Sequence, residues 1–137
     1  MPPTDAEIVG ILREARRIAV IGLGTKVHRP AYGVAAYLQR AGYTIVPVHP
    51  TAVTVLGQPV FRDLTSAAEA GPIDVVNVFR RSDAIPEIVA PCVAVAPRLV
   101  WLQEGIRDDA SARQLEAAGI PVVQDRCLAV EPHRLGV

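Results

Sequence analysis

The sequence predicts one α/β domain in which helices cover both faces of a parallel β-sheet, a Rossmann-like three-layer sandwich. Two observations support this prediction. Short apolar runs alternate with segments of helical periodicity along all 137 residues, and strands that alternate with helices form parallel sheets joined by right-handed crossovers. No internal repeat, low-complexity tract or linker divides the chain. We therefore expect a single domain over residues 1–137, with five main parallel strands in the order 3-2-1-4-5.

A helix and a strand are expected first. Thr4 and Glu7 have the spacing of a capping box, in which a hydroxyl and a carboxylate satisfy backbone donors at the start of a helix. Apolar residues then recur at helical spacing up to Ala15. Residues 18–22 form an apolar run ending in glycine, which is typical of a strand buried on both faces.

The same alternation continues to the end of the chain. A helix is expected over residues 31–41, with Gly42 as its C-terminal stop. Pro86 and Pro91 are expected to interrupt a later helical stretch. The remaining elements are strands over 44–48, 74–79, 98–103 and 121–124, a candidate short strand over 57–61, and helices near 65–70, 82–95 and 109–118.

Composition excludes several classes of protein. The 14 Lys and Arg residues balance 14 Asp and Glu, whereas a protein that coats nucleic acid normally carries a basic excess. A hydrophobic content of 50% excludes a disordered chain. No apolar run approaches the ~20 residues that span a bilayer, and the N-terminus lacks the apolar core of a signal peptide. We therefore expect a cytoplasmic protein without nucleic-acid or membrane partners. Cys92 and Cys127 are too few for a disulfide scaffold or a zinc site.

The segment after the first strand carries the strongest functional signal. In a sheet of this kind, ligands bind beyond the carboxyl ends of the strands. Gly22 and Gly24 allow a ligand to approach the backbone, and the next helix directs its positive N-terminus the same way. Lys26 and Arg29 stand between these glycines and Pro30, which opens the helix. These features favour a phosphorylated ligand; a solvated loop without function is the alternative.

Two common phosphate-binding loops do not match this segment. A dinucleotide fingerprint would require its third glycine at the position of Val27. It would also require an acid at the end of the second strand, where this chain has His49. The Gly-Lys-Ser/Thr motif of a nucleoside-triphosphate loop is absent.

The charges are unevenly distributed along the chain. Between Glu14 and Asp63 there is no acidic residue and there are six basic ones, so the rest of the chain has a balance of −6. Arg16 and Arg17 precede the first strand and are expected at the opposite end of the sheet from the glycines. The zero net charge therefore conceals a positive region that includes the glycine loop and favours a small anionic ligand.

Motifs spread over nearly the whole chain share their order and spacing with a known family. They are Gly22-Leu23 with Lys26, residues 29–34 (Arg-Pro-Ala-Tyr-Gly-Val), Gly42-Tyr43, residues 46–50 (Val-Pro-Val-His-Pro), residues 57–61 (Gly-Gln-Pro-Val-Phe), Val78-Phe79-Arg80, residues 101–106 (Trp-Leu-Gln-Glu-Gly-Ile) and Asp125-Arg126-Cys127. With these motifs the chain resembles the small stand-alone CoA-binding proteins. Their domain is similar to the N-terminal CoA-binding domain of the succinyl-CoA synthetase alpha subunit.

The resemblance implies that the small-molecule ligand is coenzyme A or a short acyl-CoA. The chain departs from the family pattern at three positions: His49 stands where Asn is expected, Gly24 where Ser is expected, and Ala31 where Ser is common. The residues it implies are Gly22, Gly24, Thr25, Lys26, Arg29 and Pro30 for the CoA phosphates, His49, Pro50, Phe79 and Arg80 beside the adenosine part, and Gln103 and Gly105 toward the pantetheine arm.

No catalytic residue or metal ligand is predicted. The synthetase relatives phosphorylate a histidine in a second domain, and this chain ends before such a domain, so the ligase reaction is not expected. For His28 and His49, ligand contact or solvent exposure is expected rather than general-base chemistry. Cys127 follows the last strand near the predicted site, where it is either a small packed side chain or a thiol that exchanges with that of CoA. Cys92 is expected to pack in a helix.

We therefore expect a protein that binds coenzyme A or a short acyl-CoA without catalytic machinery of its own. Two alternatives remain at this point. One is a Rossmann-type redox enzyme or sensor that binds NAD(P), and the other is an interaction module without a small-molecule ligand. The sequence is compatible with a homodimer.

Overall fold

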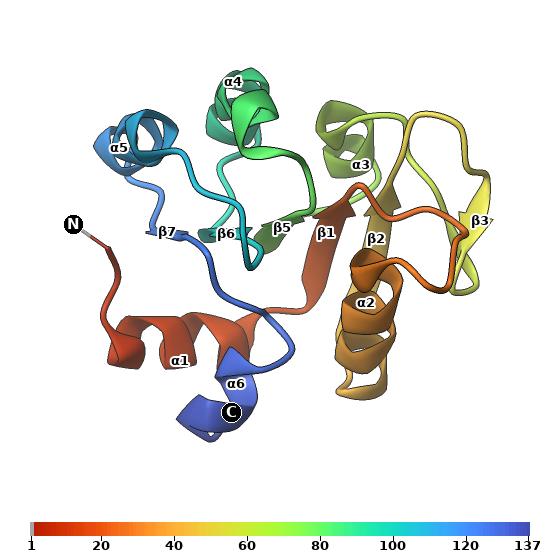
Figure 1. The fold of residues 1–137 in the computed structure, drawn as a ribbon, viewed down its shortest axis with the longest axis horizontal. Coiled ribbons are helices and arrows are strands. Elements are labelled where there is room, and N and C mark those ends of the chain that lie inside the picture. The colour runs from red at the N-terminus through yellow and green to blue at the C-terminus, as the bar shows by residue number, and fades with distance from the viewer. Residues whose placement is uncertain (1) are drawn as a thin grey trace.

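The computed structural model of the chain describes residues 2–137 and contains a parallel β-sheet between two layers of helices (Figure 1). The sheet has five strands, all parallel to their neighbours, as the alternating pattern predicts. They are β1 (Arg17–Ile21), β2 (Thr44–Val48), β5 (Val75–Val78), β6 (Leu99–Leu102) and β7 (Val122–Val123).

The strand order in the sheet is β2-β1-β5-β6-β7. Outside β2, Phe61 forms a parallel bridge with Val48, and its N–H donates to the carbonyl of Pro47. With this short segment counted as the third strand, the order corresponds to the expected 3-2-1-4-5 arrangement, with β7 added at the far edge. The strand expected at 74–79 corresponds to β5. In this count it is the fourth strand, and it pairs with β1. The strand order reverses between β1 and β5, which is where ligands bind in such sheets.

The residues between β2 and the Phe61 segment form a small separate hairpin. Strands β3 (Thr54–Val55) and β4 (Gln58–Pro59) pair antiparallel through a two-residue turn. Leu56 and Gly57 both have positive φ, as the tight turns that join hairpin strands require. The candidate strand at 57–61 is thus divided between this hairpin and the bridge to β2.

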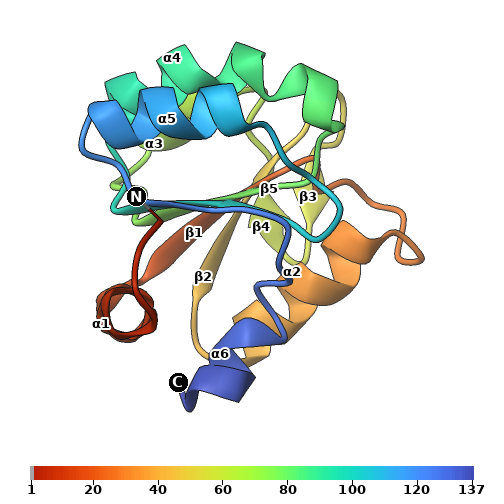
Figure 2. The same ribbon diagram turned by 60° about the vertical axis from the view of Figure 1, so that its left-hand side comes forward.

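Helices cover both faces of the sheet (Figures 1 and 2). The two layers bury separate apolar clusters, one containing Val76 and Leu115 and the other Ile18, Leu38 and Trp101. One helical layer on each side of the sheet gives the three-layer sandwich that the sequence predicts. One face carries α3 (Leu64–Glu69), α4 (Pro86–Val95) and α5 (Asp109–Ala117), and the other carries α1 (Asp5–Glu14), α2 (Pro30–Arg40) and α6 (Glu131–Leu135).

Local sequence signals explain most helix boundaries. The capping box is present, because Thr4 Oγ1 accepts from the Glu7 N–H and the Glu7 carboxylate accepts from the Thr4 N–H. Asp63 caps α3 by accepting the Ser66 N–H at 2.8 Å, and this bond lowers the pKa of its carboxyl group. These caps satisfy backbone donors that a helix start leaves free.

The prolines of α4 behave differently from one another. Pro86 begins α4 and separates it from the 3-10 turn η1 (Ser82–Ala84), as expected. Pro91, however, lies inside α4 and does not interrupt it, so that expectation is wrong. Proline removes the hydrogen bond to the carbonyl four residues earlier, and this residue is the exposed Glu87, where water can replace the donor.

Two further features concern the whole chain. The C-terminal helix α6 has no counterpart in the sequence-based prediction, although Pro132 at its start is a helix signal. No helix in the part of the chain that the structure describes has the length and apolar character needed to cross a membrane.

Candidate functional site

Gly22 forms the base of the candidate site, directly after β1. Its N–H donates to the carbonyl of Val48 in β2, while the Phe79 N–H after β5 donates to the carbonyl of Ile21. Gly22 has a φ of +95°, and a Cβ atom placed on it would lie 2.4 Å from the Phe79 carbonyl oxygen. Only glycine therefore allows the ends of these strands to approach so closely.

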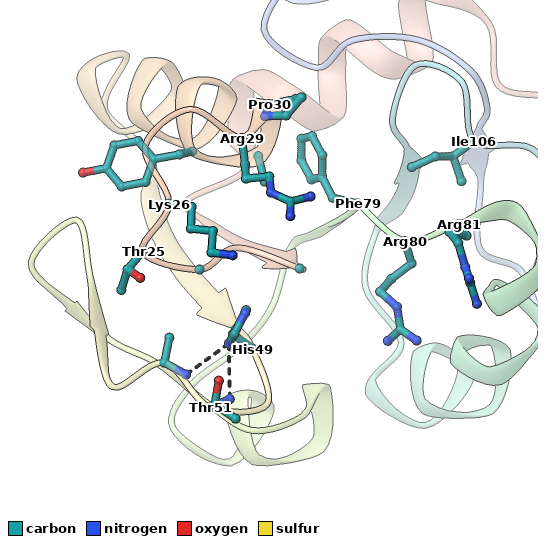
Figure 3. Close-up of a pocket in the computed structure, with 15 residues that line it drawn as sticks. Thr25, Lys26, Arg29, Pro30, His49, Thr51, Phe79, Arg80, Arg81 and Ile106 are labelled. Carbon is teal, nitrogen blue, oxygen red and sulfur yellow. Dashed lines mark hydrogen bonds between the residues drawn. The ribbon is translucent and has the colours of Figure 1, made fainter.

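A cleft of about 860 Å³ opens at this end of the sheet (Figure 3). We call it the main cleft. It lies where the strand order reverses, as the general rule for ligand sites in parallel sheets predicts. Its lining residues are Gly22, Gly24, Thr25, Lys26, Arg29, Pro30, Ala31, Tyr32, His49, Thr51, Ala52, Phe79, Arg80, Arg81 and Ile106.

The main cleft is electropositive. Lys26 and Arg29 lie on one side of it and Arg80 and Arg81 on the other, with Phe79 between them (Figure 3). None of the described residues that line the cleft is acidic. Lys26 and Arg29 are exposed and form no ion pair with any residue from 2 to 137. The cleft therefore presents positive charge that its own walls leave largely unneutralised.

Arg80 and Arg81 each have an acidic neighbour at the rim of the main cleft. Arg80 Nη2 lies 3.7 Å from Glu87 Oε2, and Arg81 Nε lies 3.3 Å from Asp83 Oδ1. All four side chains are substantially exposed, and such surface pairs contribute only about 0–1 kcal/mol. An anion in the cleft can therefore draw either guanidinium away at little cost.

The N-terminus of α2 adds to this positive field. Pro30 is at the first helical position, and the first turn contains no acidic side chain. A helix N-terminus carries about half a positive elementary charge and free backbone N–H groups, which favour anions. The helix begins directly at the cleft wall, so its dipole and the side chains of Lys26 and Arg29 act on the same space.

His49 is held in one orientation at the carboxyl end of β2. Its Nδ1 accepts hydrogen bonds from the N–H groups of Thr51, at 3.2 Å, and Ala52, at 3.0 Å (Figure 3). Because both partners are backbone donors, Nδ1 carries no proton and Nε2 is the protonated nitrogen. An asparagine oxygen at this position would accept from the same turn. His49, in place of the expected Asn, thus still accepts the hydrogen bonds of the turn through Nδ1 and adds an N–H donor, Nε2, beside the cleft.

Gly24, where the family pattern has Ser, lies directly beside the His49 ring. A Cβ atom on Gly24 would lie 2.9 Å from His49 Nε2 and 3.0 Å from Cδ2. The imidazole cannot move away without losing its two hydrogen bonds to the turn. A serine at residue 24 therefore fits beside a small side chain such as Asn but not beside His49.

We expect Gly24→Ser to destabilise the protein by about 1–3 kcal/mol, the usual cost of overpacking, and His49→Asn/Gly24→Ser to recover most of this loss. Denaturant unfolding of the two single variants and the double variant measures the coupling energy between the sites. Additive effects of the two substitutions would show that the ring and the residue-24 side chain do not compete for space.

The structure brings together most of the residues expected in the site. Nine of the twelve line the main cleft, and Pro50, Gln103 and Gly105 do not. Pro50 is exposed, because the turn after His49 directs it outward. The Gly105 N–H is occupied by Asp125 Oδ1 at 2.7 Å, so it is not free for a ligand. His28 is also exposed and lines no described cavity.

Gln103 lines a second cavity of about 510 Å³, which we call the side cavity. It shares three walls, Pro30, Phe79 and Ile106, with the main cleft. The two spaces are therefore neighbours that meet at these three residues. The side cavity is lined by Pro30, Gly33, Val34, Tyr37, Phe79, Gln103, Glu104, Ile106, Cys127 and Ala129.

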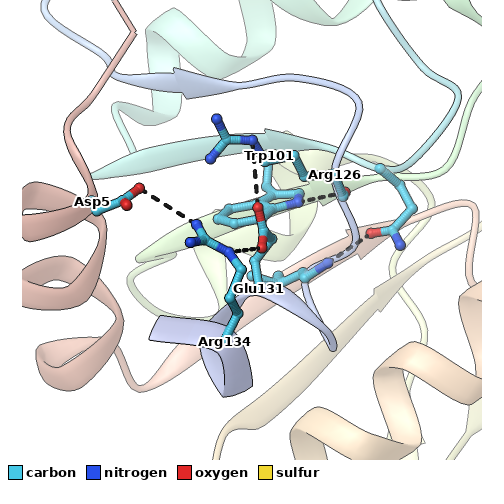
Figure 4. Close-up of polar contacts among 7 residues, drawn as sticks. Asp5, Trp101, Arg126, Glu131 and Arg134 are labelled. Atoms are coloured by element: carbon cyan, nitrogen blue, oxygen red, sulfur yellow. Dashed lines mark hydrogen bonds and ion pairs between the residues drawn. The ribbon is translucent and has the colours of Figure 1, made fainter. Parts of the chain in front are cut away.

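Cys127 reaches the side cavity through a well-anchored segment after β7. The buried Trp101 donates from Nε1 to the carbonyl of Arg126 at 2.8 Å (Figure 4). Glu131 accepts from Arg134 Nε at 2.6 Å and lies 3.5 Å from Arg126 Nε. Cys127 is thus half-buried against a ligand-sized space, whereas Cys92 is fully buried in α4, as expected.

Sequence reasoning missed some residues of the main cleft. Thr51 and Ala52 line it although they were not among the residues expected in the site. Each follows the carboxyl end of a strand by a few residues, which is the signal that would have included them. Ile106 is part of a motif quoted for the family, and its place between the two cavities depends on the tertiary fold.

Comparison with known proteins gives a consistent result. The family described as CoA binding domain matches residues 16–133. The uncharacterized protein YneT of Bacillus subtilis (strain 168) is 37% identical over 128 residues, which cover 93% of each chain.

Solved structures agree with this match. The cell-free ID.343 protein of Thermus thermophilus superimposes with a TM-score of 0.90 at 38% identity, over 97% of this chain and 99% of that one. A hypothetical protein from Pyrococcus horikoshii OT3 gives a TM-score of 0.91 at 28% identity, over 100% of this chain and 97% of its own. The dinucleotide-forming acetyl-coenzyme A synthetase 1 of Ca. Korarchaeum cryptofilum, at 16% identity and a TM-score of 0.71, shares the fold over 84% of this chain and 27% of its own.

Proposed function

Because the chain belongs to the CoA-binding domain family, we propose that it binds coenzyme A in the main cleft. The observation that carries this proposal is the placement of Lys26, Arg29, Arg80 and Arg81 around a cleft whose described lining contains no acidic residue, at the N-terminus of α2. Coenzyme A carries a diphosphate and a ribose 3′-phosphate. Two separated pairs of cations match a ligand with two phosphate groups.

The phosphates and the adenosine would lie in different parts of the main cleft. Lys26, Arg29 and the first turn of α2 would bind the diphosphate, because charge-assisted bonds and the helix dipole act there together. His49 would donate from Nε2 to a phosphate or adenosine oxygen. Phe79 offers an aromatic face beside the cleft, on which an adenine ring can stack.

Binding without catalysis is part of the proposal. The described lining of the main cleft contains no cysteine and no carboxylate to activate a nucleophile or to accept a proton. His49 Nδ1 already accepts two backbone N–H groups, so it is not free to act as a general base. At the end of β2, where a dinucleotide site would carry an acid for the ribose, the chain has His49, which disfavours NAD(P).

Calorimetric titration with CoA, acetyl-CoA, NAD⁺ and NADP⁺ in parallel tests the proposal. We expect saturable binding of the two CoA compounds, weakened by added salt because it depends on exposed charges. Saturable binding of NAD⁺ with no heat from either CoA compound would overturn it in favour of a nicotinamide-dependent protein. Binding of none of the four ligands would instead indicate an interaction module.

A further inference from the structure

The side cavity differs in chemistry from the main cleft beside it. Among the described residues that line it, only Gln103 and Glu104 carry an amide or a charge. The other walls are apolar or weakly polar, and Val34, Phe79, Cys127 and others belong to or pack against a hydrophobic core cluster. A ligand group in this cavity therefore gains mainly apolar contacts, which favours hydrocarbon over charged or amide groups.

Gln103 lines the side cavity in an orientation that two hydrogen bonds fix. It is 5% exposed, and its Oε1 accepts from the Leu128 N–H at 3.3 Å and from Asn77 Nδ2 at 3.2 Å. The Leu128 donor is a backbone N–H, so the Gln103 atom that it contacts is the amide oxygen. Asn77 Nδ2 also donates to the Trp101 carbonyl, which identifies it as the amide nitrogen. Gln103 Nε2 donates to no residue in the range 2–137. The NH2 group of this buried amide thus has no partner among the described residues.

The position of the side cavity indicates which part of a ligand would reach it. The main cleft and the side cavity meet at Pro30, Phe79 and Ile106. A CoA molecule with its phosphates at Lys26 and Arg29 can extend its arm past these three residues. The end of that arm, which carries the thiol or thioester, then enters the apolar space.

We propose that the side cavity receives the thioester end of an acyl-CoA with a short, uncharged aliphatic acyl group, and that Gln103 Nε2 donates to the thioester carbonyl. This inference rests on the proposed binding of CoA in the main cleft. Free CoA leaves the apolar walls of the side cavity partly unfilled. Glu104 is the only charged side chain among the described lining residues, and it repels an acyl group that ends in a carboxylate.

Calorimetry with CoA, butyryl-CoA and succinyl-CoA tests the acyl preference. We expect butyryl-CoA to bind at least fivefold more tightly than CoA, and succinyl-CoA to bind less tightly than butyryl-CoA. Equal affinities for CoA and butyryl-CoA, or tightest binding of succinyl-CoA, would overturn the inference while leaving CoA binding intact. If no CoA compound binds, the proposed function itself fails, and this inference fails with it.

A cavity-filling variant locates the preference in the side cavity. A Cβ atom on Gly33 would have no atom within 4 Å, so Gly33→Leu extends a side chain into this space. Leucine also favours a helix more than glycine does. We expect this variant to lose the preference for butyryl-CoA over CoA. Gly10→Leu is the matched control, because Gly10 lies in α1, lines no described cavity and also has no atom within 4 Å of its Cβ position. An unchanged preference in Gly33→Leu would contradict the placement.

The two cysteines provide an independent measurement of occupancy. Cys127 lines the side cavity, whereas Cys92 is buried and its burial raises the pKa of its thiol to about 12. Iodoacetamide should therefore modify Cys127 first, since the thiolate is the reactive form. We expect butyryl-CoA to protect Cys127 and adenosine 3′,5′-bisphosphate, which lacks the pantetheine arm, to leave it reactive. Modification of Cys127 at the same rate with saturating butyryl-CoA would overturn the inference.

Discussion

Gly22→Ala is expected to destabilise the protein by about 2–5 kcal/mol, the sum of a left-handed backbone conformation and of steric overlap. The backbone contribution arises because the φ of +95° at residue 22 disfavours any side chain. The overlap arises because the new Cβ would lie 2.4 Å from the carbonyl oxygen of Phe79, which is held by strand pairing. Denaturant unfolding measures the loss. We also expect weaker CoA binding, because relief of the overlap displaces Phe79 from the cleft wall.

Gly42→Ala is the matched control for this variant. Gly42 has a similar φ of +107°, but a Cβ atom there would meet nothing within 4 Å. It should therefore lose only the backbone contribution, about 1–2 kcal/mol, and should bind CoA normally because it is remote from the cleft. If Gly22→Ala is no less stable than Gly42→Ala, the close approach of β1 and the Phe79 carbonyl is not a constraint on residue 22.

Arg29→Ala is expected to weaken CoA binding by about 1.5–3 kcal/mol, the range for a hydrogen bond to a charged group. This corresponds to roughly a 10- to 150-fold increase in Kd. Arg29 is exposed, lines the cleft and has no ion-pair partner in residues 2–137, so its removal should hardly affect folding. Calorimetric titration of the folded variant with CoA gives the change directly.

Arg40→Ala separates a local contact from a general effect of charge. Arg40 is exposed in the last turn of the same helix, α2, at the end away from the cleft. Both variants lose one positive charge, but only Arg29→Ala removes a charge that lines the cleft. An Arg29→Ala affinity equal to that of Arg40→Ala would place the phosphates elsewhere.

Much of the fold follows from local patterns in the sequence. The strand predicted over 44–48 has the observed bounds of β2, and the capping box at Thr4 and Glu7 forms as predicted. Buried apolar runs and helix caps depend on neighbouring residues, so a single sequence contains them. The helix α6 was missed because its five residues are too few to show a periodic pattern, and contacts such as Arg134 with Asp5, at 3.6 Å, tie it to α1.

Most residues of the main cleft could also be predicted from the sequence. The expected residues that lie elsewhere have one cause in common. Glycines and basic residues after a strand indicate a phosphate site, and Gly22, Lys26 and Arg29 do line the cleft. Gly105 lies after a strand as well, yet its N–H faces Asp125, which is distant in sequence, and Gln103 lines the side cavity instead of the main cleft. Whether a residue at a strand end faces a ligand or another loop depends on contacts that no local pattern contains.

The α/β class and the basic glycine loop after the first strand can be recognised from the amino-acid sequence, because these properties arise within short segments. Three features depend on long-range contacts: Arg80 and Arg81 lie opposite that loop, the ring of His49 lies close to Gly24, and a second, apolar cavity adjoins the cleft. Strand order and crossover direction bring these residues together from distant parts of the chain. The positive stretch read along the sequence thus became one wall of a cleft, and the opposite wall came from a region whose net charge is negative.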